Sequence, residues 1–189
     1  MNKLIFGFTF ISFFAFVNPI LTAQNKNVAA KLVYGELFGP GVVMSANFDS
    51  RFDSDERMGL GYRIGIGYGF EQFDENIAEF LFGDGKISSL HDGVMRTFYS
   101  FPAGINYVFG NQRRASTFEV GVGVTFLTRN VSIFNWEMEK PGHFIGFLNF
   151  MYRLMPVNGG VTFRIGFSPM IGTAGDLFPM GAVGLGYAF

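Results

Sequence analysis

MGLGYRIGIGYGFE, residues 58–71, is the stretch of the chain that most clearly predicts its fold. Apolar and aromatic side chains occupy every second position from Met58 to Phe70, while glycine, Arg63 and Glu71 occupy the positions between them. Successive side chains of a β-strand point to opposite faces, so a strand would sort this stretch into an apolar face and a glycine-rich face. A helix would scatter the same residues around its circumference. The stretch therefore predicts a long β-strand.

The same alternation recurs along the rest of the chain. The regular segments are 42–52, 99–109, 118–127, 162–168 and 183–189, and less regular strand-like segments lie at 31–38 and 143–155. With 58–71 they make eight candidate strands. Several have the ~9–11 residues that a strand needs to cross a bilayer.

The connections between these strands alternate in length. Short polar or glycine-rich connections lie at 53–57, 110–116 and 156–160, and longer ones at 71–96, 130–142 and 170–180. Outer-membrane barrels have long external loops and short periplasmic turns. Gly39-Pro40-Gly41 is an exception, which we expect to form a very short external turn. We therefore predict an all-β fold, an eight-stranded antiparallel up-and-down transmembrane β-barrel.

The apolar face is expected to face lipid. In the second candidate strand this face includes Val42. In a soluble ligand-binding barrel the apolar face would line the cavity and the outside would be charged. Here the opposite face is mostly glycine, which makes a poor solvent face but suits a narrow interior. No segment after the N-terminal one has 18 consecutive apolar residues, so the apolar content is expected to lie on strands.

Residues 1–23 have the features of a secretory signal peptide. Lys3 supplies the positive charge, Leu4 to Val17 is an uncharged apolar run, and Leu21-Thr22-Ala23 offers a small residue before the cut. We predict cleavage after Ala23, which leaves a barrel domain of residues 24–189. A transmembrane anchor is the alternative, but the run is shorter than the ~20 residues that span a bilayer.

The C-terminal run VGLGYAF resembles the assembly signal of bacterial outer-membrane barrels, which alternates apolar residues and ends in phenylalanine. The residues that carry this resemblance are Val183, Leu185, Tyr187 and Phe189. The whole of 24–189 is similar to the small eight-stranded barrels of the OmpA and OmpX type. The resemblance implies an integral protein of a Gram-negative outer membrane, in contact with its lipid and inserted by the barrel-assembly machinery. These families share no catalytic residues, so it implies none.

Composition limits the possible chemistry. The chain has no cysteine, which excludes disulfides, thiolate metal sites, a cysteine nucleophile and an acylated-cysteine anchor. The net charge is −1 and no basic face is apparent, so nucleic acid is not expected as a partner. Two separated histidines make a weak metal hypothesis. We expect no cofactor, and we expect His143 to be an interfacial residue.

Charged side chains gather on the predicted interior face. We expect seven to form an interior charge network: Glu36, Asp49, Arg51, Arg63, Glu119, Arg153 and Arg164. Glu71 and Arg129 are assigned to the same face, and all of the seven except Glu36 to the periplasmic half. Buried charges must be paired, because an isolated one is costly. The network predicts either a polar plug that closes the barrel or a narrow, slightly cationic pore.

The long connections offer two further hypotheses. Ser88, Ser89, His91 and Asp92 have the residue types of hydrolases that act on outer-leaflet lipid, but nearness in a long loop does not show a catalytic arrangement, and solvated loop residues are the preferred interpretation. Trp136 and Phe80-Leu81-Phe82 would suit an extracellular protein or glycan partner, or the membrane interface. The leading prediction is a non-enzymatic barrel that serves envelope integrity or adhesion. A narrow channel and a lipid-modifying enzyme are the alternatives.

Overall fold

Eight long strands dominate the computed structural model, which describes residues 29–70, 97–129 and 142–189. They are β1 (Lys31–Phe38), β2 (Met44–Arg51), β3 (Gly59–Phe70), β4 (Thr97–Gly110), β5 (Ser116–Leu127), β6 (Phe144–Leu154), β7 (Gly160–Phe167) and β10 (Gly181–Ala188). The shorter elements are the 3-10 turn η2 (Gly39–Gly41) and the strands β8 (Met170–Ile171) and β9 (Leu177–Phe178). The described residues contain no helix that is long and apolar enough to cross a membrane.

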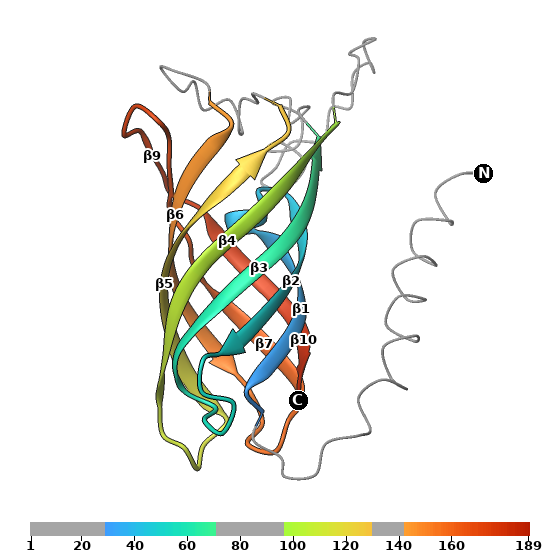
Figure 1. Cartoon of the computed structure of the whole chain (residues 1–189), viewed down its shortest axis with the longest axis vertical. Helices are drawn as coiled ribbons and strands as arrows, with labels where there is room; N and C mark the ends of the chain where they lie inside the picture. The colour runs from blue at the N-terminus through green and yellow to red at the C-terminus, as the bar shows by residue number, and fades with distance from the viewer. Residues whose placement is uncertain (1–28, 71–96, 130–141) are drawn as a thin grey trace, which may run out of the picture.

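The strands close into an antiparallel barrel. Sequential neighbours pair from β1 to β7, and β10 pairs with both β7 and β1. Leu32 to Phe38 of β1 lie opposite Ala188 to Ala182 of β10, so the last strand seals the first. Figure 1 shows that the strands are tilted relative to the long axis of the barrel, with the C-terminus and the start of β1 at the lower end. The predicted eight-stranded antiparallel barrel is confirmed.

Side chains sort between the two surfaces of the wall as the alternation predicts. Ile64, Val122 and Leu185 point outward and are 52%, 49% and 53% exposed, whereas Arg63 and Asn106 on the other face are almost fully buried. The glycine-rich face is therefore the interior, and the apolar face is the outer surface.

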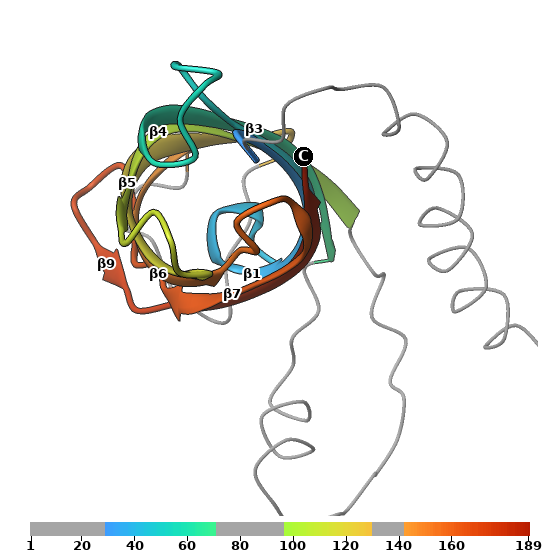
Figure 2. The ribbon, with the colours of Figure 1, turned by 90° about the horizontal axis from the view of Figure 1, so that it is seen from below.

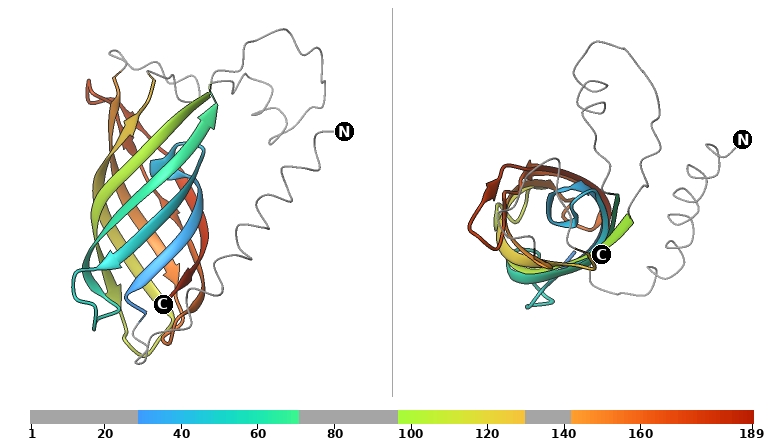
Figure 3. Two further views of the ribbon diagram at one scale, coloured as in Figure 1. Left: turned by 45° about the vertical axis from the view of Figure 1, so that its right-hand side comes forward. Right: turned by 90° about the horizontal axis from the view of Figure 1, so that it is seen from above.

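The β1–β2 connection departs from the prediction. Residues 39–43 do not project outward from the upper end, because the turn folds into the barrel, where Gly39, Pro40 and Gly41 are buried. The light blue segment lies inside the ring of strands both from below in Figure 2 and from above in Figure 3. Val42 is buried as well, so its expected place on the lipid-facing surface is wrong.

The segment after β7 also differs from a plain loop. β8 pairs with β6 through Gly146 opposite Ile171 and Phe147 opposite Met170, and β9 pairs with β8. The part of the segment that holds β9 loops outside the ring of strands (Figure 2). Toward the upper end, β8 therefore takes the place of β7 beside β6.

Candidate functional site in the barrel interior

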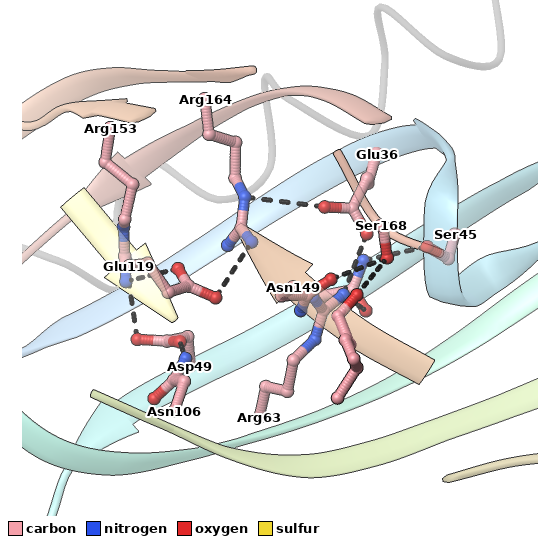
Figure 4. A network of polar contacts seen from close by, with 12 residues as sticks. Glu36, Ser45, Asp49, Arg63, Asn106, Glu119, Asn149, Arg153, Arg164 and Ser168 are labelled. Carbon is pink, nitrogen blue, oxygen red and sulfur yellow. Dashed lines mark hydrogen bonds and ion pairs between the residues drawn. The ribbon is translucent and has the colours of Figure 1, made fainter. Parts of the chain in front are cut away.

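The structure places all seven predicted interior charges inside the barrel, each at most 4% exposed. Six ion pairs join them, end to end, into one chain across the lumen. Its order is Arg51, Asp49, Arg153, Glu119, Arg164, Glu36, Arg63. Figure 4 labels all of its members except Arg51. These residues come from β1, β2, β3, β5, β6 and β7, so the chain ties most of the wall together.

Asp49 anchors one end of this charge chain. Its Oδ1 lies 2.5 Å from Nη2 of Arg51 and 3.4 Å from Nη2 of Arg153. Asn106 donates from Nδ2 to the other oxygen of Asp49 and accepts at Oδ1 from Arg51 over 2.7 Å. Arg51 also donates to the backbone carbonyl of Gly59 over 2.8 Å. The carboxylate is therefore shared between two arginines and an amide.

Glu119 and Glu36 continue the chain. Arg153 lies 2.9 Å from Oε2 of Glu119, and Arg164 lies 3.2 Å from Oε1 of the same carboxylate. Arg164 also reaches Glu36 over 3.4 Å, and Arg63 pairs with the other Glu36 oxygen over 2.8 Å. Each carboxylate thus lies between two guanidinium groups.

The network carries four arginines and three carboxylates, which leaves a net charge of +1 within the barrel. Tyr34 stabilises two of these arginines, because its ring centroid lies 4.2 Å from Cζ of Arg164 and 5.5 Å from Cζ of Arg63. The negative face of an aromatic ring attracts a cation. Phe147 adds a second ring 5.7 Å from Arg63.

Neutral polar side chains complete the network. Arg63 donates to Oδ1 of Asn47 over 3.1 Å, and Asn47 donates to Ser45 over 2.8 Å. With its amide turned to suit its neighbours, Asn149 accepts from Arg63 and donates to Ser168, both over 2.7 Å. Sequence reasoning did not identify Tyr34 or the three asparagines, although all occupy inward positions of the alternation.

Interior glycines make room for these long side chains. A Cβ at Gly61 would lie 2.4 Å from Cζ of Arg51, and one at Gly184 would lie 2.8 Å from Cγ of Arg164. Contacts this short cannot be accommodated without movement of the arginines. Glycine at these two positions therefore leaves room for Arg51 and Arg164, whereas a Cβ at Gly166 would first meet the Phe150 carbonyl of the neighbouring strand, at 2.1 Å.

The upper half of the interior holds a cluster of buried apolar side chains. Its buried members are Val42, Val43, Phe98, Leu127, Ile145, Met170 and Met180. The carbonyl of Pro40 accepts from Thr125 Oγ1 over 2.7 Å, and that of Gly41 accepts from Ser100 Oγ over 2.8 Å. The inward turn and this cluster, which we call the upper plug, lie above the charge network.

The backbone on both sides of η2 is strained. Phe38 and Val42 have φ angles of 61° and 73°, a region that side chains other than glycine seldom adopt. The strain persists because packing and the two hydrogen bonds hold the turn in place. The sequence motif Gly-Pro-Gly marked a turn but carried no sign of its inward direction.

Arg57 connects the turns at the lower end. It is 3% exposed and donates to four backbone carbonyls: Met155 over 2.8 Å, Arg114 over 2.7 Å, Gln112 over 3.1 Å and Asn111 over 3.2 Å. It therefore joins its own turn to the β4–β5 and β6–β7 turns. Burial lowers the pKa of this guanidinium. Sequence analysis assigned residues 53–57 to a polar turn and missed this role.

Several predicted residues lie away from the network. Arg129 is exposed, so its assignment to the interior is wrong; it follows the end of β5. His143 is also exposed and stacks on Phe126 with ring centroids 5.9 Å apart. Glu71, Ser88, Ser89, His91, Asp92, Trp136, residues 80–82 and the predicted signal peptide lie outside the described residues. Within the described ranges, no three His, Asp or Glu side chains are grouped to hold a metal ion.

Comparison with known proteins gives one structural likeness. No family model matches the sequence, and no curated protein matches it. Among solved structures, the chain is similar to the N-terminal β-barrel domain of Pseudomonas aeruginosa OprF, with 12% sequence identity and a TM-score of 0.46. The match covers 84% of this chain and 95% of that one. The fold assignment here rests on the strand pairings of the chain itself.

Proposed function

We propose that this chain is an integral outer-membrane β-barrel with a closed lumen, which serves the integrity of the envelope. The observation that carries the proposal is the two groups of side chains buried inside the barrel. An unbroken chain of buried ion pairs occupies the lower lumen, and an apolar plug occupies the upper lumen. A barrel of eight strands has an interior that side chains can fill, and these two groups of buried side chains support a closed lumen.

The outer surface supports a location in lipid. Half-exposed apolar side chains cover it, and aromatic side chains gather near both ends of the strands. Near the upper end lie Tyr68, Tyr99, Phe126 and Phe144. Near the lower end lie Tyr107, Phe109, Phe118 and Tyr152. Two aromatic girdles that flank an apolar band are typical of outer-membrane barrels.

Energetics favour closure over conduction. Separating a buried ion pair so that one charge is left alone costs about 3–5 kcal/mol. An ion that crossed the lower lumen would have to disrupt several such pairs at once. It would then meet Val42, Val43 and Met170, which offer no hydrogen bonds to replace its water.

Planar-bilayer recording of the refolded protein tests the closed lumen. We expect no steady currents once insertion is established by a heat-dependent gel shift in detergent. Val122→Ala, a change on the outer wall, should be equally silent. Steady, ion-selective openings in the unaltered protein would favour the narrow-channel alternative.

The envelope role has its own test. Deletion of the gene should make cells sensitive to detergent, and a copy that encodes the unaltered chain should restore resistance. Normal resistance after deletion would contradict the role. Altered outer-leaflet lipid on overexpression would instead favour the enzyme hypothesis.

Adhesion to an extracellular protein or glycan belongs to the same proposal, through the connections at 71–96 and 130–142. A variant with residues 72–95 replaced by a short Gly-Ser linker should keep its gel shift and lose binding of cells to a glycan or matrix-protein array. Unchanged binding would leave the barrel without this second role.

A further inference from the structure

An apolar groove of about 600 Å³ lies in the outer wall where β7, β10 and the β9 segment meet. Ile165 and Val183 line it from the outward face of the wall. Met180 and Ala182 line it from the buried face, and Met180 belongs to the upper plug. The groove therefore joins the lipid-facing surface to the apolar interior.

The strand pattern explains why the wall is indented at this point. β7 ends at Phe167, opposite Gly181, and the chain then leaves to pair β8 with β6. On the other side of β10, the pairing with β1 ends at Phe38 opposite Ala182, after which η2 turns inward. β10 itself begins at Gly181, and just above it the Ser168 N–H donates to the Met180 carbonyl over 2.6 Å. The regular ladders on both sides of β10 therefore end at nearly the same height.

Gly181 deepens the indentation. It is exposed, and its missing side chain would point outward at the edge of the groove. A Cβ built there would have Gly166 O as its neighbour at 3.7 Å, an ordinary van der Waals distance. A larger side chain at Gly181 can thus enter the groove without a collision with the backbone.

The chemistry of the groove limits its occupant. Among the described residues that line it, none has a charged or hydrogen-bonding side chain. A polar headgroup would lose its hydration there without a replacement. A hydrocarbon chain would lose nothing and would gain contacts with Ile165, Met180 and Val183.

We infer that this groove binds an acyl chain of a lipid from the surrounding membrane. The inference rests on the proposed location of the barrel in a bilayer, because the groove opens on the same surface as Ile165 and Val183. Its volume falls within the ~300–1,000 Å³ of small-molecule sites. A bound chain would fill the indentation that the departure of β8 leaves in the wall.

Photo-cross-linking tests the site. The purified protein is reconstituted in phosphatidylcholine vesicles that contain phosphatidylcholine with a diazirine near the end of one acyl chain, and labelled residues are mapped by mass spectrometry. We expect the peptide 177–183 to be labelled severalfold more than other outward-facing peptides. Gly181→Leu should lower that label severalfold, and Gly181→Ala should lower it less.

The control is Ala103→Leu, which adds similar bulk to the exposed outer face of β4, far from the groove. It should leave the label on 177–183 unchanged, and all variants should keep the gel shift of a folded barrel. If all outward-facing peptides are labelled equally and Gly181→Leu does not change the label, the acyl-chain site is contradicted while the membrane location still holds. The same holds if the wall is labelled and 177–183 is not. No label on any outward-facing peptide would overturn the proposed function itself.

Discussion

The charge network contains fewer carboxylates than arginines. Loss of a carboxylate should therefore lower the free energy of unfolding more than loss of an arginine. Glu119→Gln leaves four guanidinium groups against two carboxylates, whereas Arg164→Met leaves three against three. We expect Glu119→Gln to lower the free energy of unfolding by about 3–5 kcal/mol, as loss of a buried partner does. Arg164→Met should cost clearly less, although its guanidinium also contacts the Tyr34 ring. Urea unfolding in lipid vesicles measures both.

The matched control for these substitutions is Arg113→Met, because Arg113 is an exposed arginine in the β4–β5 turn. It should change stability by no more than ~0.5 kcal/mol. Equal decreases in the free energy of unfolding for Glu119→Gln and Arg164→Met would show that the excess positive charge does not affect stability.

A second prediction at this scale concerns the hydroxyl that holds the inward turn. Thr125→Val keeps the shape of the side chain and leaves the buried Pro40 carbonyl without its donor. An unsatisfied buried acceptor costs about 1–3 kcal/mol, so the free energy of unfolding should fall by that amount and the unfolding midpoint should move to a lower urea concentration. Thr97→Val, at an exposed position of β4, serves as the control and should leave the unfolding curve in place.

At the scale of elements, the lower turns act as one unit through Arg57. Arg57→Lys keeps the charge but replaces a planar group with several donors by a compact ammonium, which cannot reach all four carbonyls at once. We expect faster amide hydrogen exchange in residues 111–114 and 155–159, although the substitution lies in neither turn. Arg113→Lys should leave exchange in both turns unchanged. Faster exchange confined to 53–58 would mean that the three turns open independently.

The strands and turns also show how much of the fold the sequence could predict. Alternation of side chains is a local property, so it located eight strands and their inward faces, including the seven network charges. The path of residues 39–43 depends on where β1 and β2 end relative to longer neighbours, which no local pattern contains. Arg57 was missed for a related reason, since its partners are backbone carbonyls that exist only once three distant turns meet.

For the whole molecule, the charge network lies below the upper plug along the lumen. In the proposed closed barrel these two groups would act as two barriers in series. This arrangement predicts that removing charge alone does not open a pore. The double variant Arg153→Ala and Arg164→Ala shortens two side chains that span the lower lumen. It leaves Val42, Val43 and Leu127 in place above. We therefore expect no steady current through it in a planar bilayer, as for the unaltered protein.

A variant with Arg113→Ala and Arg114→Ala, two exposed turn residues, controls for the loss of two positive charges. Both double variants need the heat-dependent gel shift as proof of insertion. Ion-selective current through the interior variant, with silence of the turn variant, would contradict the series arrangement. It would mean that the charge network alone closes the barrel and that water already fills the space around the inward turn.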